Sequence, residues 1–233
     1  MVDTRPAPPA PATTTWVKPA GIKNIVAERH AKLGGMLAES AEPMSRKILI
    51  LTGDGGDSYE ALYAYQRFQE ARWEPVLAAP SRRQLHMMIH DREPGWSTYT
   101  EHPGHQMEAD VAITAVAARE FAALIIVGGR APEYLRNDPS VLSLVREFAQ
   151  QDKCIVAIGH GVQLLTAAGL TAGRTLTGHP HVQVEVERGG GTFVSKPAVR
   201  DGKLITAQTW RSHPECYREV FLCLSEASRA AGT

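Results

Sequence analysis

Short, unbroken apolar runs recur along the central part of this chain. Apart from Lys47 and Thr52 at the ends of the first, the runs at 47–52, 121–127 and 154–158 are apolar, as in strands buried on both faces of a parallel sheet. Residues 75–79 form a shorter run of the same kind, and the pattern at 84–90 predicts a further short strand. Five buried or half-buried strands are therefore expected before residue 160.

Amphipathic segments with helical spacing separate these runs. The first is predicted at 58–72 with Ser58 as its N-cap, and the second at 141–151 after Asp138-Pro139. Strands that alternate with helices indicate an α/β fold, with a mostly parallel sheet covered on both faces.

The pattern changes after Gly173. Residues 181–187, 192–196 and 203–208 alternate in the manner of short strands, and Asp201-Gly202 signals a tight turn before the last of them. A final helix is predicted over about 214–230.

Residues 1–45 form a predicted N-terminal extension to a domain at 46–233. Residues 1–15 are rich in Pro, Ala and Thr, which favours a mobile segment. Residues 21–40 carry apolar side chains at helical spacing, which predicts an amphipathic helix that docks on the domain or on a second subunit.

Composition narrows the possible functions. The 25 basic residues balance the 25 acidic ones, which gives no sign of a nucleic-acid partner. No apolar run is long enough to cross a membrane, and the N-terminus lacks a secretion signal, so a cytoplasmic location is expected. The three cysteines show no metal-ligand spacing, and we expect them to be reduced.

The most informative segment is the transition from the strand at 154–158 into Gly159-His160-Gly161. A sharp turn from a buried strand into a helix is where many α/β enzymes hold a nucleophile. Here the turn residue is Gly159, which has no side chain. A second glycine-rich loop, Gly128-Gly129-Arg130, follows the strand at 121–127. Ligands of open parallel sheets bind beyond the carboxyl ends of the strands, so the two loops are expected to share one crevice and its backbone N–H donors.

Three titratable residues are candidates for chemistry in this crevice. Glu60 lies in the first turn of the first helix, where burial would raise its pKa and suit it to proton transfer. His160 opens the helix after the glycine turn, and His179 lies in a Thr-Gly-His-Pro segment.

Two other segments carry candidate functional groups. The loop at 90–105 contains three histidines with Asp91, Glu93 and Glu101, but the spacing matches no metal-ligand signature. A loop that covers the substrate or contacts a second subunit is the preferred interpretation, with His102, His105 or Glu101 reaching a neighbouring pocket. Trp210 and His213 precede the final helix, where packing is the default role and pocket lining the alternative.

Three segments together resemble the ThiJ/PfpI superfamily, and the resemblance covers about residues 46–228. They are Gly128-Gly-Arg-Ala-Pro-Glu-Tyr-Leu-Arg136, Val156-Ala-Ile-Gly-His-Gly-Val-Gln-Leu-Leu165, and Ala168-Gly-Leu with Gly173-Arg. That superfamily includes the Parkinsonism-associated deglycase, PfpI-type intracellular proteases and isocyanide hydratase. The resemblance implies a flavodoxin-like three-layer sandwich of the class I glutamine-amidotransferase type, assembled as a homo-oligomer, either a dimer or a hexamer.

The resemblance also assigns residues. Members use a cysteine at the position of Gly159, so this chain is identified as a variant without that nucleophile. Glu60 matches the glutamate beside the cysteine, His160 the histidine that follows it, and His179 a pocket histidine. The Gly128-Gly129 loop matches the oxyanion-binding turn. Cys154, inside the preceding strand, is expected to be buried and inert.

Three functions follow as hypotheses. The first is a non-covalent acid–base enzyme (a lyase, hydratase, isomerase or cyclase) acting on a small polar, carbonyl-like substrate without a cofactor or metal. The second is an inactive small-molecule-binding or regulatory protein. The third is a metal-assisted hydrolase with Glu60, His160 and His179 as ligands. Under the first, Glu60 and His160 are catalytic, and the substrate is bound by Gly129, Arg130, Gly159, Gly161 and His179.

Overall fold

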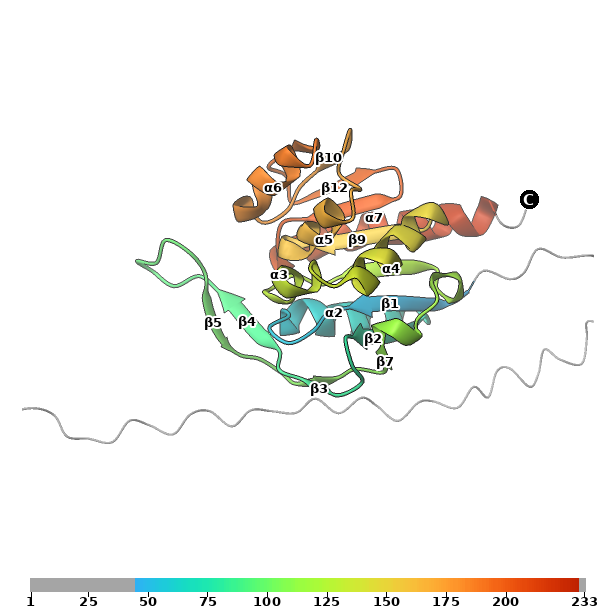
Figure 1. The fold of residues 1–233 in the computed structure, drawn as a ribbon, viewed down its shortest axis with the longest axis horizontal. Helices are drawn as coiled ribbons and strands as arrows, with labels where there is room; N and C mark the ends of the chain where they lie inside the picture. The colour runs from blue at the N-terminus through green and yellow to red at the C-terminus, as the bar shows by residue number, and fades with distance from the viewer. Residues whose placement is uncertain (1–44, 231–233) are drawn as a thin grey trace, which may run out of the picture.

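The computed structural model describes residues 45–230, so the predicted mobile segment 1–15 and the helix 21–40 lie outside the described residues. A seven-stranded sheet forms the centre, in the order β12-β13-β9-β8-β1-β2-β7 (Figure 1). Only β12 runs antiparallel to its neighbour; the other pairs are parallel. In chain order the strands are β1 (Lys47–Leu51), β2 (Glu74–Ala79), β7 (Val111–Ala112), β8 (Ala123–Ile126), β9 (Cys154–Ile158), β12 (Ala198–Asp201) and β13 (Leu204–Ala207).

Helices cover both faces of this sheet, which confirms the predicted three-layer α/β fold. They are α2 (Ser58–Glu70), α3 (Ala131–Leu135), α4 (Pro139–Gln150), α5 (Val162–Ala167), α6 (Gln183–Arg188) and α7 (His213–Ala230). The N-cap of α2 is Asp57 rather than the predicted Ser58, because the Asp57 carboxylate accepts from the Glu60 N–H.

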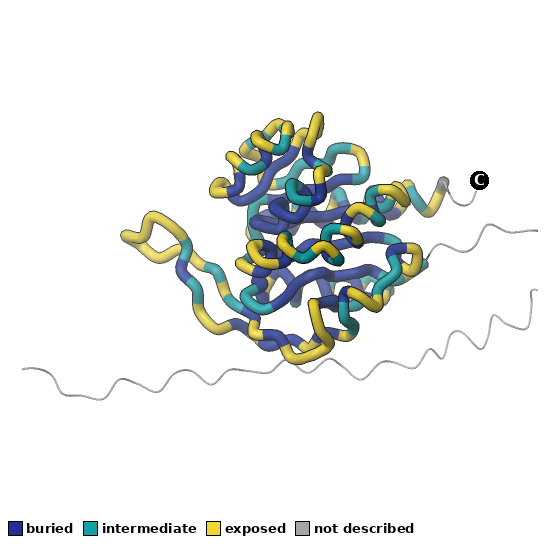
Figure 2. The backbone as a smooth tube through the Cα atoms, in the orientation of Figure 1, coloured by how far each residue is buried: buried dark blue, intermediate teal, exposed yellow. Residues whose placement is uncertain are grey.

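The strand residues alternate between two cores. Ile48 and Ile50 of β1 pack with the side chains of α2 and α7, whereas Leu49 and Leu51 pack with α4 and α5. The central strands are buried along their length (Figure 2), as their unbroken apolar runs predict.

The prediction of one continuous strand at 84–90 is wrong. It divides into β3 (Gln84–Leu85) and β4 (Met88–Asp91), because His86 hydrogen-bonds to the loop after β1: its N–H donates to Asp54 and its carbonyl accepts from Gly55. β4 pairs with β5 (Thr100–Pro103) in a hairpin that projects from the body (Figure 1), and β3 pairs with β6 (Met107–Glu108). The loop predicted after residue 90 is therefore partly a β-hairpin.

The strand predicted at 181–187 is also wrong, because the segment is helical. A 3₁₀ turn at Pro180–Val182 leads into α6. Nearby, β10 (Thr175–Leu176) and β11 (Thr192–Phe193) form a small parallel pair. The turn predicted at Asp201-Gly202 is confirmed, since it joins β12 to β13.

The three cysteines are free and buried. A hydrogen bond with Cys223 and burial raise the pKa of the Cys154 thiol well above its ordinary value, so Cys154 stays protonated. Among the helices at 45–230, none combines the length and apolar character that a membrane span requires.

Candidate active site

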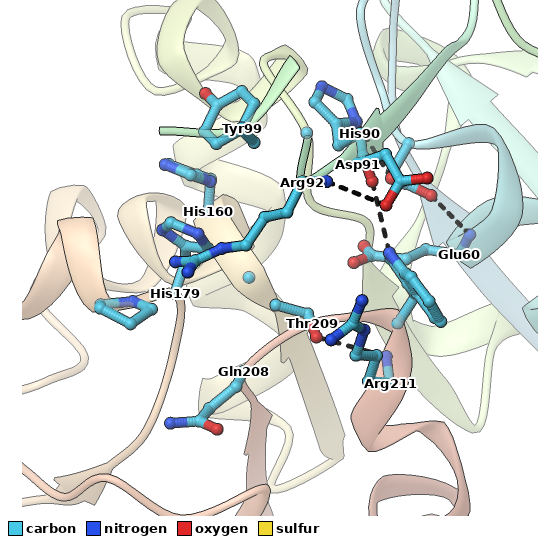
Figure 3. Close-up of a pocket in the computed structure, with 15 residues that line it drawn as sticks. Glu60, His90, Asp91, Arg92, Tyr99, His160, His179, Gln208, Thr209 and Arg211 are labelled. Carbon is cyan, nitrogen blue, oxygen red and sulfur yellow. Dashed lines mark hydrogen bonds and ion pairs between the residues drawn. The ribbon is translucent and has the colours of Figure 1, made fainter. Parts of the chain in front are cut away.

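A cavity of about 250 Å³ lies beyond the carboxyl ends of four neighbouring parallel strands, β13, β9, β8 and β1 (Figure 3). This volume is below the range of about 300–1,000 Å³ typical of sites for drug-sized ligands, which indicates a small ligand. Its lining comes from the α2 start, the strand-end loops, the β4–β5 hairpin and the segment before α7: Asp57, Glu60, His90, Asp91, Arg92, Tyr99, Gly129, Gly159, His160, His179, Pro180, Gln208, Thr209, Trp210 and Arg211.

Glu60 lies at the bottom of this cavity and is 3% exposed. Its Oε2 accepts a hydrogen bond of 2.7 Å from the Gly128 N–H. Burial, and then the nearby Asp57 carboxylate, raise the pKa of Glu60 well above its ordinary value of 4.5, while the Gly128 bond opposes the shift. The net direction favours the protonated, neutral form of Glu60 on the lining of the cavity.

The glycine loops are shaped around this carboxyl group. A Cβ on Gly128 would lie 2.9 Å from Glu60 Oε2 and 2.8 Å from the Ile158 carbonyl, so only glycine allows the close approach. Gly159 has a φ of +56°, the strained turn predicted from the sequence. A Cβ there would meet nothing closer than 3.5 Å and would stand 3.8 Å from Glu60 Oε1. Position 159 thus has room for a side chain that faces Glu60, and the sequence leaves it empty.

Asp57 connects the cavity to the hairpin. Its Oδ1 caps α2, and its Oδ2 lies 3.0 Å from His90 Nδ1. The other His90 nitrogen approaches Glu101 Oε1 at 3.3 Å without hydrogen-bond geometry. Gly129 makes room for this ring, because a Cβ at Gly129 would lie 2.7 Å from His90 Cε1.

His160 and His179 form the wall opposite His90. Their rings stack with centroids 4.7 Å apart. Burial, followed by the neighbouring His181, lowers the pKa of His160 to about 4. Burial, followed by His160, lowers the pKa of His179 to about 3, so both rings are neutral at pH 7. The His179 Nδ1 accepts from the His181 N–H at 3.2 Å, which leaves Nε2–H as the donor of that neutral ring.

His181 joins these two histidines in the one group within residues 45–230 whose spacing could hold a metal ion, with ligand atoms within 4.8 Å of one another. Glu60 is not part of that group. The predicted ligand set of Glu60, His160 and His179 is therefore not brought together as a metal site.

The sequence profile of the DJ-1/PfpI family matches residues 46–221. The chain belongs to the DJ-1/PfpI family. Protein DJ-1 homolog D of Arabidopsis thaliana is 34% identical over 82% of this chain, and the chain spans about half of that relative's length (50%). A deglycase of Pyrococcus horikoshii is 29% identical, with 70% of this chain and 89% of the relative covered. A ThiJ/PfpI domain protein of Brachyspira murdochii has the same fold, with a TM-score of 0.67 at 20% identity over 78% of this chain and 98% of its own.

Within this DJ-1/PfpI protein, five of the seven predicted site residues line the cavity: Glu60, Gly129, Gly159, His160 and His179. The other two do not. Gly161 packs against β8, where a Cβ would lie 2.8 Å from the Ile126 carbonyl. Arg130 faces a separate hollow under the hairpin, and its Nε is 3.3 Å from Glu101.

The sequence did not single out several of the lining residues, although it predicted that the loop at 90–105 covers the substrate or contacts a second subunit. His90, Arg92 and Tyr99 come from the hairpin, and Arg211 comes from the turn before α7. The indole of Trp210 lines the cavity, as its alternative interpretation proposed, while His213 packs between aromatic rings and stacks on Tyr63 at 4.4 Å. The histidine content of 90–105 was the available signal, but it did not specify which side chain turns inward.

Proposed function

We propose that this DJ-1/PfpI protein is a non-covalent acid–base enzyme of the lyase, hydratase, isomerase or cyclase type. Its substrate would be a small polar molecule with a carbonyl or similar group. One observation carries the proposal: the buried Glu60 carboxyl group faces an unfilled corner at Gly159, 3.8 Å from where a side chain would begin.

Glu60 would act as the general acid and then as the general base. A neutral carboxyl can donate its proton to a carbonyl oxygen, or to the carbon of an enol, and recover one in the next step. The His179 Nε2–H is positioned as a second donor on the opposite wall, and the neutral His160 beside it can accept or relay a proton. General acid–base help supplies about 10²–10⁴-fold and a hydrogen-bond donor to a developing oxyanion about 10²–10³-fold, enough for an intrinsically easy reaction.

The relatives named deglycases give a thiol-based alternative for comparison. Covalent catalysis needs an activated nucleophile at the reacting carbon. The chain has Gly at the strand-end turn, and its three cysteines are buried in the cores. We therefore infer chemistry without the family cysteine, and we also propose a cytoplasmic homo-oligomer, a dimer or a hexamer.

A substrate panel tests the proposal. Small aldehydes, ketones, 2-oxo acids and isocyanides are incubated with the protein in D₂O and followed by ¹H NMR for consumption, hydration or deuterium exchange. We expect turnover of at least one class, reduced by 100-fold or more in Glu60→Gln, with Glu70→Gln on the exposed end of α2 as the matched control. Turnover that Glu60→Gln leaves intact contradicts the role of Glu60. Binding without turnover in any class supports the binding or regulatory alternative instead.

Metal-assisted hydrolysis is a second candidate, favoured by the cluster of His160, His179 and His181. One observation weighs against it. The Nδ1 of His179 accepts a backbone N–H, so that ring would have to change tautomer to offer Nε2 to a metal. Elemental analysis of the purified protein decides the matter, since a stoichiometric metal lost in a His160→Ala/His181→Ala variant would establish this site.

A further inference from the structure

Two arginines line the cavity with no acidic partner. Arg92 follows β4 on the hairpin, and Arg211 lies in the 3₁₀ turn Trp210–Ser212. Within residues 45–230, neither guanidinium has a carboxylate oxygen within 4.0 Å, whereas Arg130 close by pairs with Glu101. Guanidinium groups offer a planar fork of donors that matches a carboxylate, so an unpaired pair of them at a cavity has unused binding capacity.

The two arginines reach one ligand space from different elements, Arg92 from the hairpin and Arg211 from the segment before α7. The Trp210 indole N–H donates to the His90 carbonyl at 3.4 Å, which ties the segment before α7 to the hairpin. Arg211 lies over the Trp210 ring, 5.0 Å from its centroid, a cation–π contact that restrains its guanidinium. Arg92 extends across the cavity toward His179 (Figure 3), and its charge contributes to lowering the pKa of that ring, after burial and the two adjacent imidazoles.

Each aspartate of the cavity lining already accepts a hydrogen bond. Asp57 caps α2 and bonds to His90, and Asp91 Oδ1 accepts from the backbone N–H of Arg92. Burial raises the pKa of Glu60, which favours its uncharged form. An anionic ligand would meet two guanidiniums and the His179 Nε2–H, on a lining that also includes Asp57 and Asp91.

We propose that the substrate of this site carries a carboxylate, held by Arg92 and Arg211, and places its carbonyl group at the Gly159 corner beside Glu60. Small 2-oxo acids are the class that fits both ends of the cavity. This inference rests on the proposed function for the second end alone, because carboxylate binding by the two arginines does not require turnover.

The test is a ligand-observed and protein-observed NMR titration at low ionic strength with pyruvate and its neutral isostere pyruvamide. We expect pyruvate to bind at least 10-fold more tightly than pyruvamide. Arg92→Gln and Arg211→Gln should each weaken pyruvate binding about 10-fold or more and leave pyruvamide unchanged. Arg82→Gln, which removes an exposed arginine outside the cavity lining, is the matched control and should have no effect.

Three results would overturn the inference: no binding of pyruvate, equal affinity for the acid and the amide, or affinity that survives both arginine substitutions. Loss of pyruvate binding on chelator treatment, with recovery on adding Zn²⁺ alone, would assign the carboxylate to the three-histidine cluster instead. The two proposals can fail separately. Pyruvate binding that depends on the carboxylate and on both arginines, without turnover of any substrate in the panel, refutes only the proposed function.

Discussion

Replacing Glu60 with Gln should stabilise the protein increasingly as the pH rises. The carboxyl group is buried, and burial raises its pKa well above 4.5, so the folded state keeps a proton that the unfolded chain releases. The sign follows from linkage: a raised folded-state pKa means that stability is complete below the unfolded pKa and is lost as the pH rises toward the folded pKa.

The size of the effect follows from one proton. Wild-type stability should fall by about 1.4 kcal/mol for each pH unit between 4.5 and the folded-state pKa, which caps the loss at about 3.4 kcal/mol by pH 7. The glutamine introduced by Glu60→Gln cannot ionise, and its amide oxygen can still accept the 2.7 Å bond from Gly128 N–H. The difference in unfolding free energy between Glu60→Gln and wild type should therefore widen with pH in favour of the variant.

Urea denaturation at a series of pH values from 4.5 to 8 measures this difference directly. Glu70→Gln on the same helix is the control, because the Glu70 carboxylate is exposed and pairs with Arg67 on the surface. A pH-independent difference between Glu60→Gln and wild type would show that Glu60 is ionised in the folded protein, and the general-acid argument would then be wrong.

Three further outcomes are expected. Gly159→Cys should fold, with a loss of about 1–2 kcal/mol in unfolding free energy from its positive φ, and should gain a thiol that iodoacetamide labels. Gly161→Cys should be more strongly destabilised, because its Cβ would lie 2.8 Å from the Ile126 carbonyl oxygen. If Gly159→Cys fails to fold or to label, the corner at Gly159 is not open. His160→Gln should reduce the loss of stability on acidification from pH 6.5 to about 4. The pKa of His160 is lowered in the folded state, so in this pH range the unfolded chain binds a proton that the folded protein does not. Parallel curves of unfolding free energy against pH for variant and wild type would refute this. His213→Phe should be stabilising by about 1–3 kcal/mol, because both ring nitrogens of His213 are buried without a partner among residues 45–230, and a destabilised variant would indicate a polar partner for that ring.

The sequence predicts the central sheet well because its strands are short apolar runs buried on both faces. Glu60, Gly159 and His160 could be placed together for a related reason. Gly159 and His160 directly follow β9, and Glu60 lies in the first turn of the helix after β1. The carboxyl ends of these parallel strands meet at one edge of the sheet.

Two kinds of feature could not be predicted in this way. At 181–187 the valines alternate as in a strand, but Val182 and Val186 are also one helical turn apart and buried, while Val184 is 54% exposed. His179 caps a 3₁₀ turn at Pro180–Val182 that leads into α6, so local turn formation overrides the alternation. The positions of Arg92 and Arg211 depend on how the hairpin and the segment before α7 dock, through contacts between residues 120 apart in the chain, such as the one from Trp210 to His90.

Acid–base chemistry by Glu60 without a thiol is tested most directly by kcat in two variants, measured with the first substrate that the panel identifies. One is a Cys154→Ala/Cys216→Ala/Cys223→Ala triple variant, verified as folded, and the other is Glu60→Gln. We predict that the cysteine-free protein keeps its kcat within a few fold, while Glu60→Gln loses 100-fold or more. Loss of turnover in the cysteine-free protein together with full turnover in Glu60→Gln would contradict the account.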